Sequence, residues 1–409
     1  YKMSFYVDAS SRAVEHCDMM ASNHSELADT YHTIAALCRQ KLWHQLTLTV
    51  LPFLSDASNL RTTPDGTNSF LALYDTLINT TIEKKLNPLS LAQMASAVAN
   101  SLVGTDGTAA KVILQNLLQE SDRLGTAATI FIESKLYLLS LNIMEIAGGN
   151  LDKDQIRTIH EGLKKNGIKL HELVVDTSTT EVHSAHYLCA MKYRKAVGPP
   201  EAFFQEALAY LNYTPMEQME SPHALAMDLS LAALTGEGVF QFGNVVTTPI
   251  LSALENTPEA WLMEFMHAMA KGDVLLFQSL SSKYAAQIQT QPALVLRAST
   301  VQEKITLLAL VHMVFERPSA ERTLPFQEIA DRIHVPVSQV EWVLMRALSL
   351  NLIQGWIDEV DQSIQVTWVI PRVLTRDQLQ ELATRFGQWA VQVRKGGDFM
   401  KEQTPTLLA

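Results

Sequence analysis

The stretch LIQGWIDEVDQSIQVTWV at residues 352–369 decides the fold of the C-terminal part of this sequence, because it carries the clearest β-strand signals in the chain. Residues 352–357 and 363–369 are rich in β-branched and aromatic side chains, which is typical of strands. The acidic turn at residues 358–361 separates the two segments. The pattern therefore predicts a β-hairpin with an acidic tip.

Three helices are predicted before this hairpin. Thr300 and Glu303 have the spacing of a capping box, which predicts the start of a helix. Residues 326–333 form a short second helix with its apolar side chains on one face. Ser338 and Glu341 repeat the capping-box spacing at the start of a third helix. Helix, helix, turn, helix and hairpin in this order predict a winged helix.

A last helix is predicted after the winged helix, from the capping-box pair Thr375 and Gln378 to Gly396 and Gly397. Its large apolar residues recur at alternating steps of three and four, which is the a/d spacing of a coiled coil. Two heptads are too short to be stable alone, so we expect partner helices to cover this C-terminal seam. Folding back onto its own winged helix remains the alternative. The C-terminal seam consists of Leu379, Leu382, Phe386, Trp389 and Val393.

The sequence between residues 25 and 213 has the helical period nearly throughout. Helix pairs would start near residues 25, 69, 107 and 152, a loose repeat of the size found in α-solenoids. An irregular helical bundle is the alternative. The predicted helices after the first are 42–54, 70–85, 89–102, 108–124, 126–147, 152–174 and 181–197.

The predicted fold class is therefore all-α dominated, with one small β-hairpin. Pro199 and Pro200 mark the main boundary, because the residue before a proline is pushed out of helix and proline suits a first turn. We expect four parts, which are an α-solenoid arm at 1–198, a second helical part at 199–299, the winged helix at 300–374, and an assembly helix and tail at 375–409.

Composition indicates a folded protein of a reducing compartment. Hydrophobic residues make up 47% and charged residues 18% of the 409 residues, and the net charge is −11. Cys17, Cys38 and Cys189 are too few and too scattered for a disulfide framework, and are expected to be small apolar fillers. Charged residues interrupt the most apolar stretch, 130–147, so we expect no membrane segment and a place in the cytoplasm or nucleus.

The charge of the winged helix argues against nucleic-acid binding. Residues 325–374 contain six acidic residues and three arginines, and the wing tip holds Asp358, Glu359 and Asp361. Duplex binding depends largely on contacts between cations and phosphates. This surface is therefore expected to repel DNA.

No residue pattern indicates catalysis. His183 and His186 share one helix face, but no third ligand has companion spacing, so they are expected to be ordinary structural histidines. The glycines at 104 and 107 lack the lysine and hydroxyl residue of a phosphate loop, and the sequence has no Gly-x-Ser-x-Gly motif. We predict a protein that is not an enzyme and has no metal or cofactor.

Several C-terminal runs resemble a known family. These are AMAKGD at 268–273, ALSLNLIQG at 347–355, IDEVD at 357–361 and TWVIPRVL at 367–374. Together they resemble the PCI domain, and more narrowly the PCI subunits of the 26S proteasome lid. The likeness extends from about residue 203 to 408, and before residue 199 only the number of helical pairs matches.

The resemblance implies a non-catalytic scaffold subunit of the regulatory-particle lid, which would support ubiquitin-dependent protein degradation. Such subunits associate through the edges of their winged helices and gather their C-terminal helices into one bundle. The implied partners are other PCI-type lid subunits and MPN-type lid subunits, including the deubiquitinase. The ubiquitin receptor and the ATPase ring are further candidates, and nucleic acid and membranes are not expected.

The second strand of the hairpin is the expected docking edge of the winged helix. If it lies at the sheet edge, Ile364, Val366 and Trp368 can pack inward while its backbone, including that of Thr367, pairs with a neighbour. A PCI subunit of the COP9 signalosome or of the third translation initiation factor remains an alternative. A winged-helix nucleic-acid-binding protein is the alternative from another class.

Overall fold

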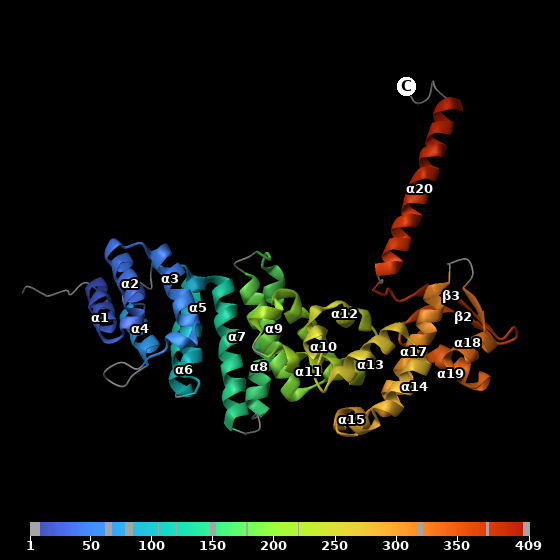
Figure 1. Ribbon diagram of the computed structural model, residues 1–409, viewed down its shortest axis with the longest axis horizontal. Helices are drawn as coiled ribbons and strands as arrows, with labels where there is room; N and C mark the ends of the chain where they lie inside the picture. The colour runs from blue at the N-terminus through green and yellow to red at the C-terminus, as the bar shows by residue number, and fades with distance from the viewer. Residues whose placement is uncertain are drawn as a thin grey trace, which may run out of the picture. The chain divides into compact units, whose positions relative to one another are not determined.

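The computed structural model describes residues 9–61, 68–77, 85–104, 106–119, 121–147, 153–176, 179–219, 221–317, 322–373 and 376–403 (Figure 1). The predicted cap at Thr375 and the end of the predicted tail lie outside these residues. The chain divides into two compact units, Tyr1–Gln218 and Met219–Ala409.

This division falls later than the predicted boundary at residue 198. Helix α10 (Pro200–Tyr213) packs against α9 (Thr180–Val197), and this contact keeps α10 in the first unit. The predicted division into four parts stays a prediction.

The first unit is a stack in which most helices contact neighbours one or two places along the chain, as in an α-solenoid, and α1 also contacts α4. The predicted arm of helical pairs is confirmed. Helix α1 was not predicted, although its buried residues Ala13, Cys17 and Met20 follow the helical steps of four and three. The remaining helices of this unit are α1 (Ala9–Asn23), α2 (Ala28–Gln40), α3 (Trp43–Ser55), α4 (Ser69–Leu77), α5 (Pro88–Leu102), α6 (Gly107–Gln119), α7 (Ser121–Ala147) and α8 (Lys153–Glu172).

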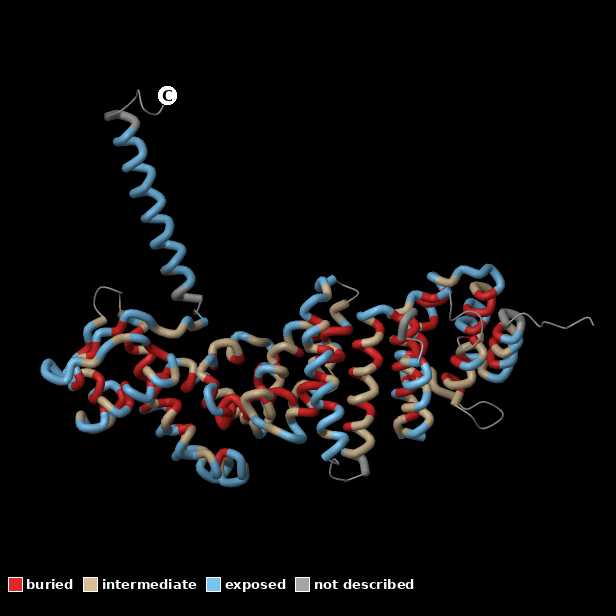
Figure 2. The backbone as a smooth tube through the Cα atoms, turned by 180° about the vertical axis from the view of Figure 1, so that it is seen from behind, coloured by how far each residue is buried: buried red, intermediate tan, exposed pale blue. Residues whose placement is uncertain are grey.

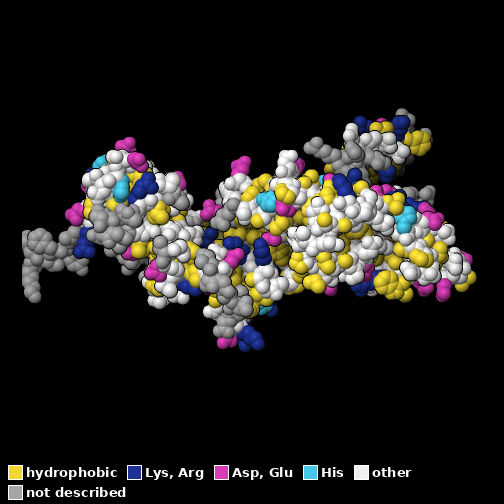
Figure 3. Space-filling model, turned by 60° about the horizontal axis from the view of Figure 1, so that its bottom comes forward, with side chains coloured by type: hydrophobic (Ala, Val, Ile, Leu, Met, Phe, Trp, Pro, Cys, Tyr) yellow, Lys and Arg dark blue, Asp and Glu magenta, His cyan; other side chains and the backbone are white. Residues whose placement is uncertain are grey.

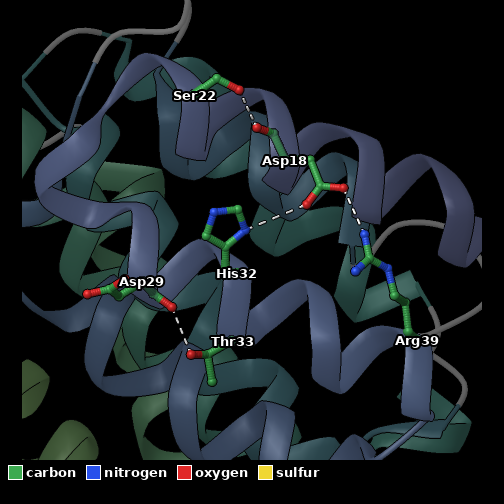
Figure 4. A network of polar contacts seen from close by, with 6 residues as sticks. All are labelled: Asp18, Ser22, Asp29, His32, Thr33 and Arg39. Carbon is green, nitrogen blue, oxygen red and sulfur yellow. Dashed lines mark hydrogen bonds and ion pairs between the residues drawn. The ribbon is translucent and has the colours of Figure 1, made fainter.

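The first two helices also share polar contacts on their exposed side (Figure 4). Arg39 of α2 donates to the Asp18 carboxylate of α1 at 2.8 Å, and His32 lies 3.9 Å from the same carboxylate. Exposed ion pairs contribute little free energy, so burial of side chains such as Tyr31 stabilises this helix pair far more.

One segment of α7, Leu124–Glu145, has 22 residues and is apolar enough to cross a membrane by length and composition alone. The charged residues within it do not take the segment below this criterion, and the expectation of no membrane segment stays a prediction. Ile130 and Ile132 of this segment are buried in the main core of the first unit. Packing against neighbouring helices explains why α7 is apolar. Its start is broken at Gly125 (φ 72°), where the sequence predicted one helix to end and another to begin.

The second unit begins with helices and ends in the winged helix. Its helical part contains α11 (Pro222–Thr235), α12 (Phe242–Thr247), α13 (Ala260–Lys271), α14 (Val274–Lys283), α15 (Ala285–Gln289), α16 (Pro292–Leu296) and α17 (Ala298–Glu316). After it come β1 (Thr323–Pro325), α18 (Phe326–Ile333), α19 (Val337–Ser349), β2 (Ile353–Asp358), β3 (Ser363–Val369) and α20 (Arg376–Gln403). The predicted winged helix is confirmed.

The sheet has three antiparallel strands in the order β1-β3-β2. The sequence did not predict β1, because it has only three residues and one of them is a proline. Leu324 of β1 pairs with Ile364 of β3, and both are fully buried. This short strand therefore places β3 in the middle of the sheet.

Two predicted capping boxes are wrong. Helix α17 begins at Ala298, so Thr300 lies inside it, and α19 begins directly after Pro336 without a side-chain cap. Asp273 does cap a helix, since its side chain accepts a hydrogen bond from the Leu276 amide of α14 at 3.0 Å.

Gly272 joins α13 to α14 in a left-handed conformation (φ 66°) and touches α17. A Cβ atom at this position would lie 2.8 Å from the Leu308 carbonyl oxygen. The tight turn and the close approach both require glycine.

We expect Gly272→Ala to lower the free energy of unfolding of the second unit by about 2–3 kcal/mol. Backbone strain and overlap with Leu308 both oppose the added methyl group. Gly238 (φ 75°) is the matched control, because its Cβ would meet nothing within 4 Å, and Gly238→Ala should cost only about 1 kcal/mol. Urea denaturation of the two variants measures the difference, and equal losses would mean that the contact with Leu308 is unimportant.

Candidate protein–protein interface

The C-terminal seam lies on α20 and is open to solvent. Its five side chains are between 39% and 63% exposed, and Figure 2 shows α20 as exposed along its described length. Figure 3 also shows hydrophobic side chains beside basic ones on this helix. The alternative in which the seam folds back onto its own winged helix is not the arrangement of this structure. The predicted end of the helix at Gly396 and Gly397 is wrong, because α20 continues to Gln403.

The segment before α20 is fixed to the rest of the second unit. The Ile370 amide donates to the Leu352 carbonyl oxygen at 2.9 Å, and the Arg372 guanidinium donates to the Ala270 carbonyl oxygen. Burial lowers the pKa of Arg372, and the nearby Glu316 carboxylate opposes that shift. A groove of about 610 Å³ borders this segment and reaches Leu379 at the start of α20.

The sheet corrects the predicted docking edge. Strand β3 is the middle strand, and its residues Ile364 and Val366 are buried under the helices, so they are not at an edge. Thr367 uses its hydroxyl to donate to the Gln354 carbonyl oxygen at 3.0 Å. The strand signals could not reveal this arrangement, because the partner strand β1 is too short to predict.

A bulge in the β2–β3 pair brings Trp368 to the outer face of the sheet. The register skips Thr367, so Trp368 lies opposite the exposed Gln354 instead of continuing the buried alternation. Trp356 is two residues from Gln354 on the same face and is 55% exposed. Among the described strands, β2 pairs on one side only.

The surface that would meet DNA in a nucleic-acid-binding winged helix is not basic. Helix α19 exposes Trp342 and Met345, and its single cation, Arg346, pairs with Glu303 at 2.6 Å. At the wing tip the Asp358 carboxylate accepts hydrogen bonds from the amides of residues 360 and 361, and Val360 is 94% exposed. These contacts leave the face without an unpaired cation on α19, and the absence of DNA binding stays a prediction.

His183 and His186 lie in a buried aromatic cluster of the first unit. The His183 ring stacks on Tyr213 at 4.7 Å between centroids, and the His186 ring meets the edge of Tyr187 at 5.4 Å. Burial, together with the neighbouring His183 and His171, lowers the pKa of His186 to about 4. Within the part of the chain that the structure describes, no group of three or more His, Cys, Asp or Glu could hold a metal ion.

Acidification should destabilise the first unit through His186. Its imidazole binds a proton near pH 6.5 in the unfolded chain but only near pH 4 in the folded one. The unfolded state therefore holds more protons between these values, and the free energy of unfolding falls as the pH falls. From pH 7 to pH 5 we expect a loss of about 2 kcal/mol from this group.

Calorimetry of the wild type and of His186→Gln at pH 7 and pH 5 measures this contribution, because other titrating groups cancel between the two proteins. The same substitution at the exposed His44 is the control. An equal acid loss in the wild type and in His186→Gln would contradict the assignment.

Lys304 is a structural residue that the sequence analysis missed. It is only 2% exposed, and its ammonium group donates to the carbonyl oxygens of Ala233 at 2.7 Å and Leu234 at 3.2 Å. Arg297 donates to the carbonyl oxygen of Thr235 at 2.8 Å. Lys304 of α17 and Arg297, the residue directly before α17, thus satisfy the last carbonyl groups of α11. In the sequence, the only sign of this role was that Lys304 stands alone among apolar residues.

Helical pairs, a second helical part, a winged helix and an unpartnered terminal helix together define a scaffold protein of the PCI class. The family model described as PSD13 N-terminal repeats matches residues 30–266, and the PCI domain model matches residues 282–368. On these matches the chain belongs to the family of 26S proteasome non-ATPase regulatory subunit 13.

Relatives of this family are similar over nearly the whole chain. Homolog A of 26S proteasome non-ATPase regulatory subunit 13 from Arabidopsis thaliana is 31% identical over 97% of this chain and 99% of its own length. The Dictyostelium discoideum subunit is 30% identical over 98% of this chain and 100% of its own length. Subunit M of eukaryotic translation initiation factor 3 from Neosartorya fischeri is 25% identical over only 42% of this chain and 36% of its own length.

Proposed function

We propose that this chain is a non-catalytic scaffold subunit of the 26S proteasome regulatory-particle lid and supports ubiquitin-dependent protein degradation. The observation that carries the proposal is similarity to non-ATPase regulatory subunits over almost the full length. The exposed C-terminal seam supports it, because five large apolar side chains at a/d spacing need partner helices.

The proposed partners are the PCI-type and MPN-type lid subunits, including the deubiquitinase. The ubiquitin receptor and the ATPase ring are further candidates. Cytoplasm and nucleus are the proposed locations. These assignments rest on the family and on the two exposed surfaces of the second unit, the C-terminal seam and the sheet.

We place the docking edge of the winged helix on β2. Its outer side can pair with a strand of a neighbouring subunit, and Trp356 stands beside it on the outer face. Trp368 extends the same face, so an aromatic contact can accompany the backbone pairing. Ile364 and Val366 support this surface from the buried side.

Affinity purification from the protein's own cells tests the proposal. The full-length chain is tagged, purified gently, and its companions are quantified by mass spectrometry. Lid and core subunits at matched stoichiometry are the expected result. If signalosome or initiation-factor subunits co-purify instead, the chain would still be a scaffold subunit, but of a different complex. A chain purified alone or with nucleic acid would contradict the proposal.

A further inference from the structure

The C-terminal seam continues beyond the residues that define it. Three residues after Val393 the a/d spacing reaches Gly396, and four residues later it reaches Met400. Val393 is 54% exposed and Met400 is 61% exposed. Helix α20 runs unbroken through these positions, so Gly396 occupies a seam position between two large apolar side chains.

The packing of this chain does not require glycine at this level of α20. A Cβ atom at Gly396 or Gly397 would meet nothing within 4 Å, and neither residue is among the glycines with a positive φ. Each glycine weakens the helix by about 1 kcal/mol relative to alanine. A close approach from outside the chain would explain both residues.

The size of the side chains in the C-terminal seam changes along α20. Phe386 and Trp389 hold a partner helix away from the axis, whereas Gly396 has no side chain to do so. Helix axes in contact lie about 8–10 Å apart, depending on the side chains between them. A partner that follows the whole seam must therefore come closer to α20 near Gly396 than near Trp389.

We propose that the partner of the C-terminal seam is an α-helix that converges with α20 toward Gly396 and Gly397. It places a large apolar side chain over the two glycines. The partner is a helix because the exposed residues repeat at the 3.5-residue period, which only another helix matches over this length. The inference rests on the proposed function, which makes the partner a helix of another lid subunit.

Three leucine substitutions in the full-length chain test the convergence. Gly396→Leu and Gly397→Leu fill the proposed point of closest approach. Gly387→Leu is the matched control, because a Cβ there also meets nothing within 4 Å but the residue follows Phe386 on the side away from the seam. All three variants gain helix propensity, and circular dichroism confirms that each is folded.

Each variant is expressed beside differently tagged wild-type chain, and incorporation into purified 26S proteasome is quantified by mass spectrometry. We expect Gly396→Leu and Gly397→Leu to incorporate about tenfold less than wild type, since overpacking a tight contact is unfavourable. Gly387→Leu should incorporate as wild type does.

Whether Gly396→Leu lowers or raises incorporation decides between a converging partner helix and an evenly spaced one. Leucine at an ordinary seam position would strengthen a coiled coil, so equal or better incorporation of Gly396→Leu overturns the convergence. The double variant Leu382→Asp with Trp389→Asp separates the two levels of inference. If it still incorporates, the seam itself has no role and the proposed function loses this support. If it fails while Gly396→Leu succeeds, only the convergence is wrong.

Discussion

Replacing Leu382 and Trp389 by aspartate will leave a folded chain that no longer joins its complex. Both side chains are exposed on α20, at 39% and 63%, and neither belongs to the buried core, so their loss removes little packing within the chain. In the assembled state they would be buried against partner helices, where a carboxylate has neither water nor a counter-charge. Two such losses at an interface centre should weaken binding about a thousandfold or more.

The control for this prediction uses the other side of the same helix. Gln380→Asp with Gln388→Asp introduces the same two charges at exposed positions outside the C-terminal seam. This variant should co-purify with lid subunits at the wild-type yield, and circular dichroism should be the same for both double variants. Full recovery of the complex with the Leu382 and Trp389 variant would contradict the role of the seam.

Replacing Lys304 by methionine will destabilise the second unit by about 3 kcal/mol. The substitution keeps the length and apolar stem of the side chain but removes the ammonium group that Ala233 and Leu234 accept from. Their carbonyl groups at the end of α11 are then buried without this donor, and the favourable interaction of a cation with a helix C-terminus is lost. The rings of Phe240 and Phe242, whose centroids lie 6.0 and 5.6 Å from the ammonium, lose a cation–π contact as well.

Urea denaturation of the full chain measures this loss in the transition of the second unit. Lys283→Met is the control, because Lys283 is exposed and its ion pair with Glu264 spans 3.4 Å at the surface. That change should alter the free energy of unfolding by less than about 1 kcal/mol. Similar effects of the two substitutions would mean that Lys304 is not a structural cap.

Periodicity predicted most of the fold, because burial imposes it directly on the sequence. The helical pairs of the arm, the break at Gly125, helix α18 and the bounds of β3 agree with the predicted positions. The C-terminal seam was predicted for the same reason, since its apolar spacing does not depend on any distant residue.

What the sequence could not predict depends on contacts between distant segments. Strand β1 has three residues and no pattern of its own, yet it turns β3 from an edge into the middle strand. The bulge that moves Trp368 outward depends on pairing with β2. Lys304 looks like an ordinary helical lysine until α11 is placed against α17. The capping-box pairs at Thr300 and Ser338 failed because spacing alone cannot locate a helix start.

The exposed surface of α20 also affects the steady-state level of this protein in the cell. A copy without its partners presents Phe386 and Trp389 to water, and such apolar surfaces attract chaperones and other unpaired chains. Assembly buries that surface, so only copies within the complex are protected from chaperones and other unpaired chains. We therefore expect surplus copies to be cleared quickly, which would tie the cellular level of this subunit to the supply of its partners.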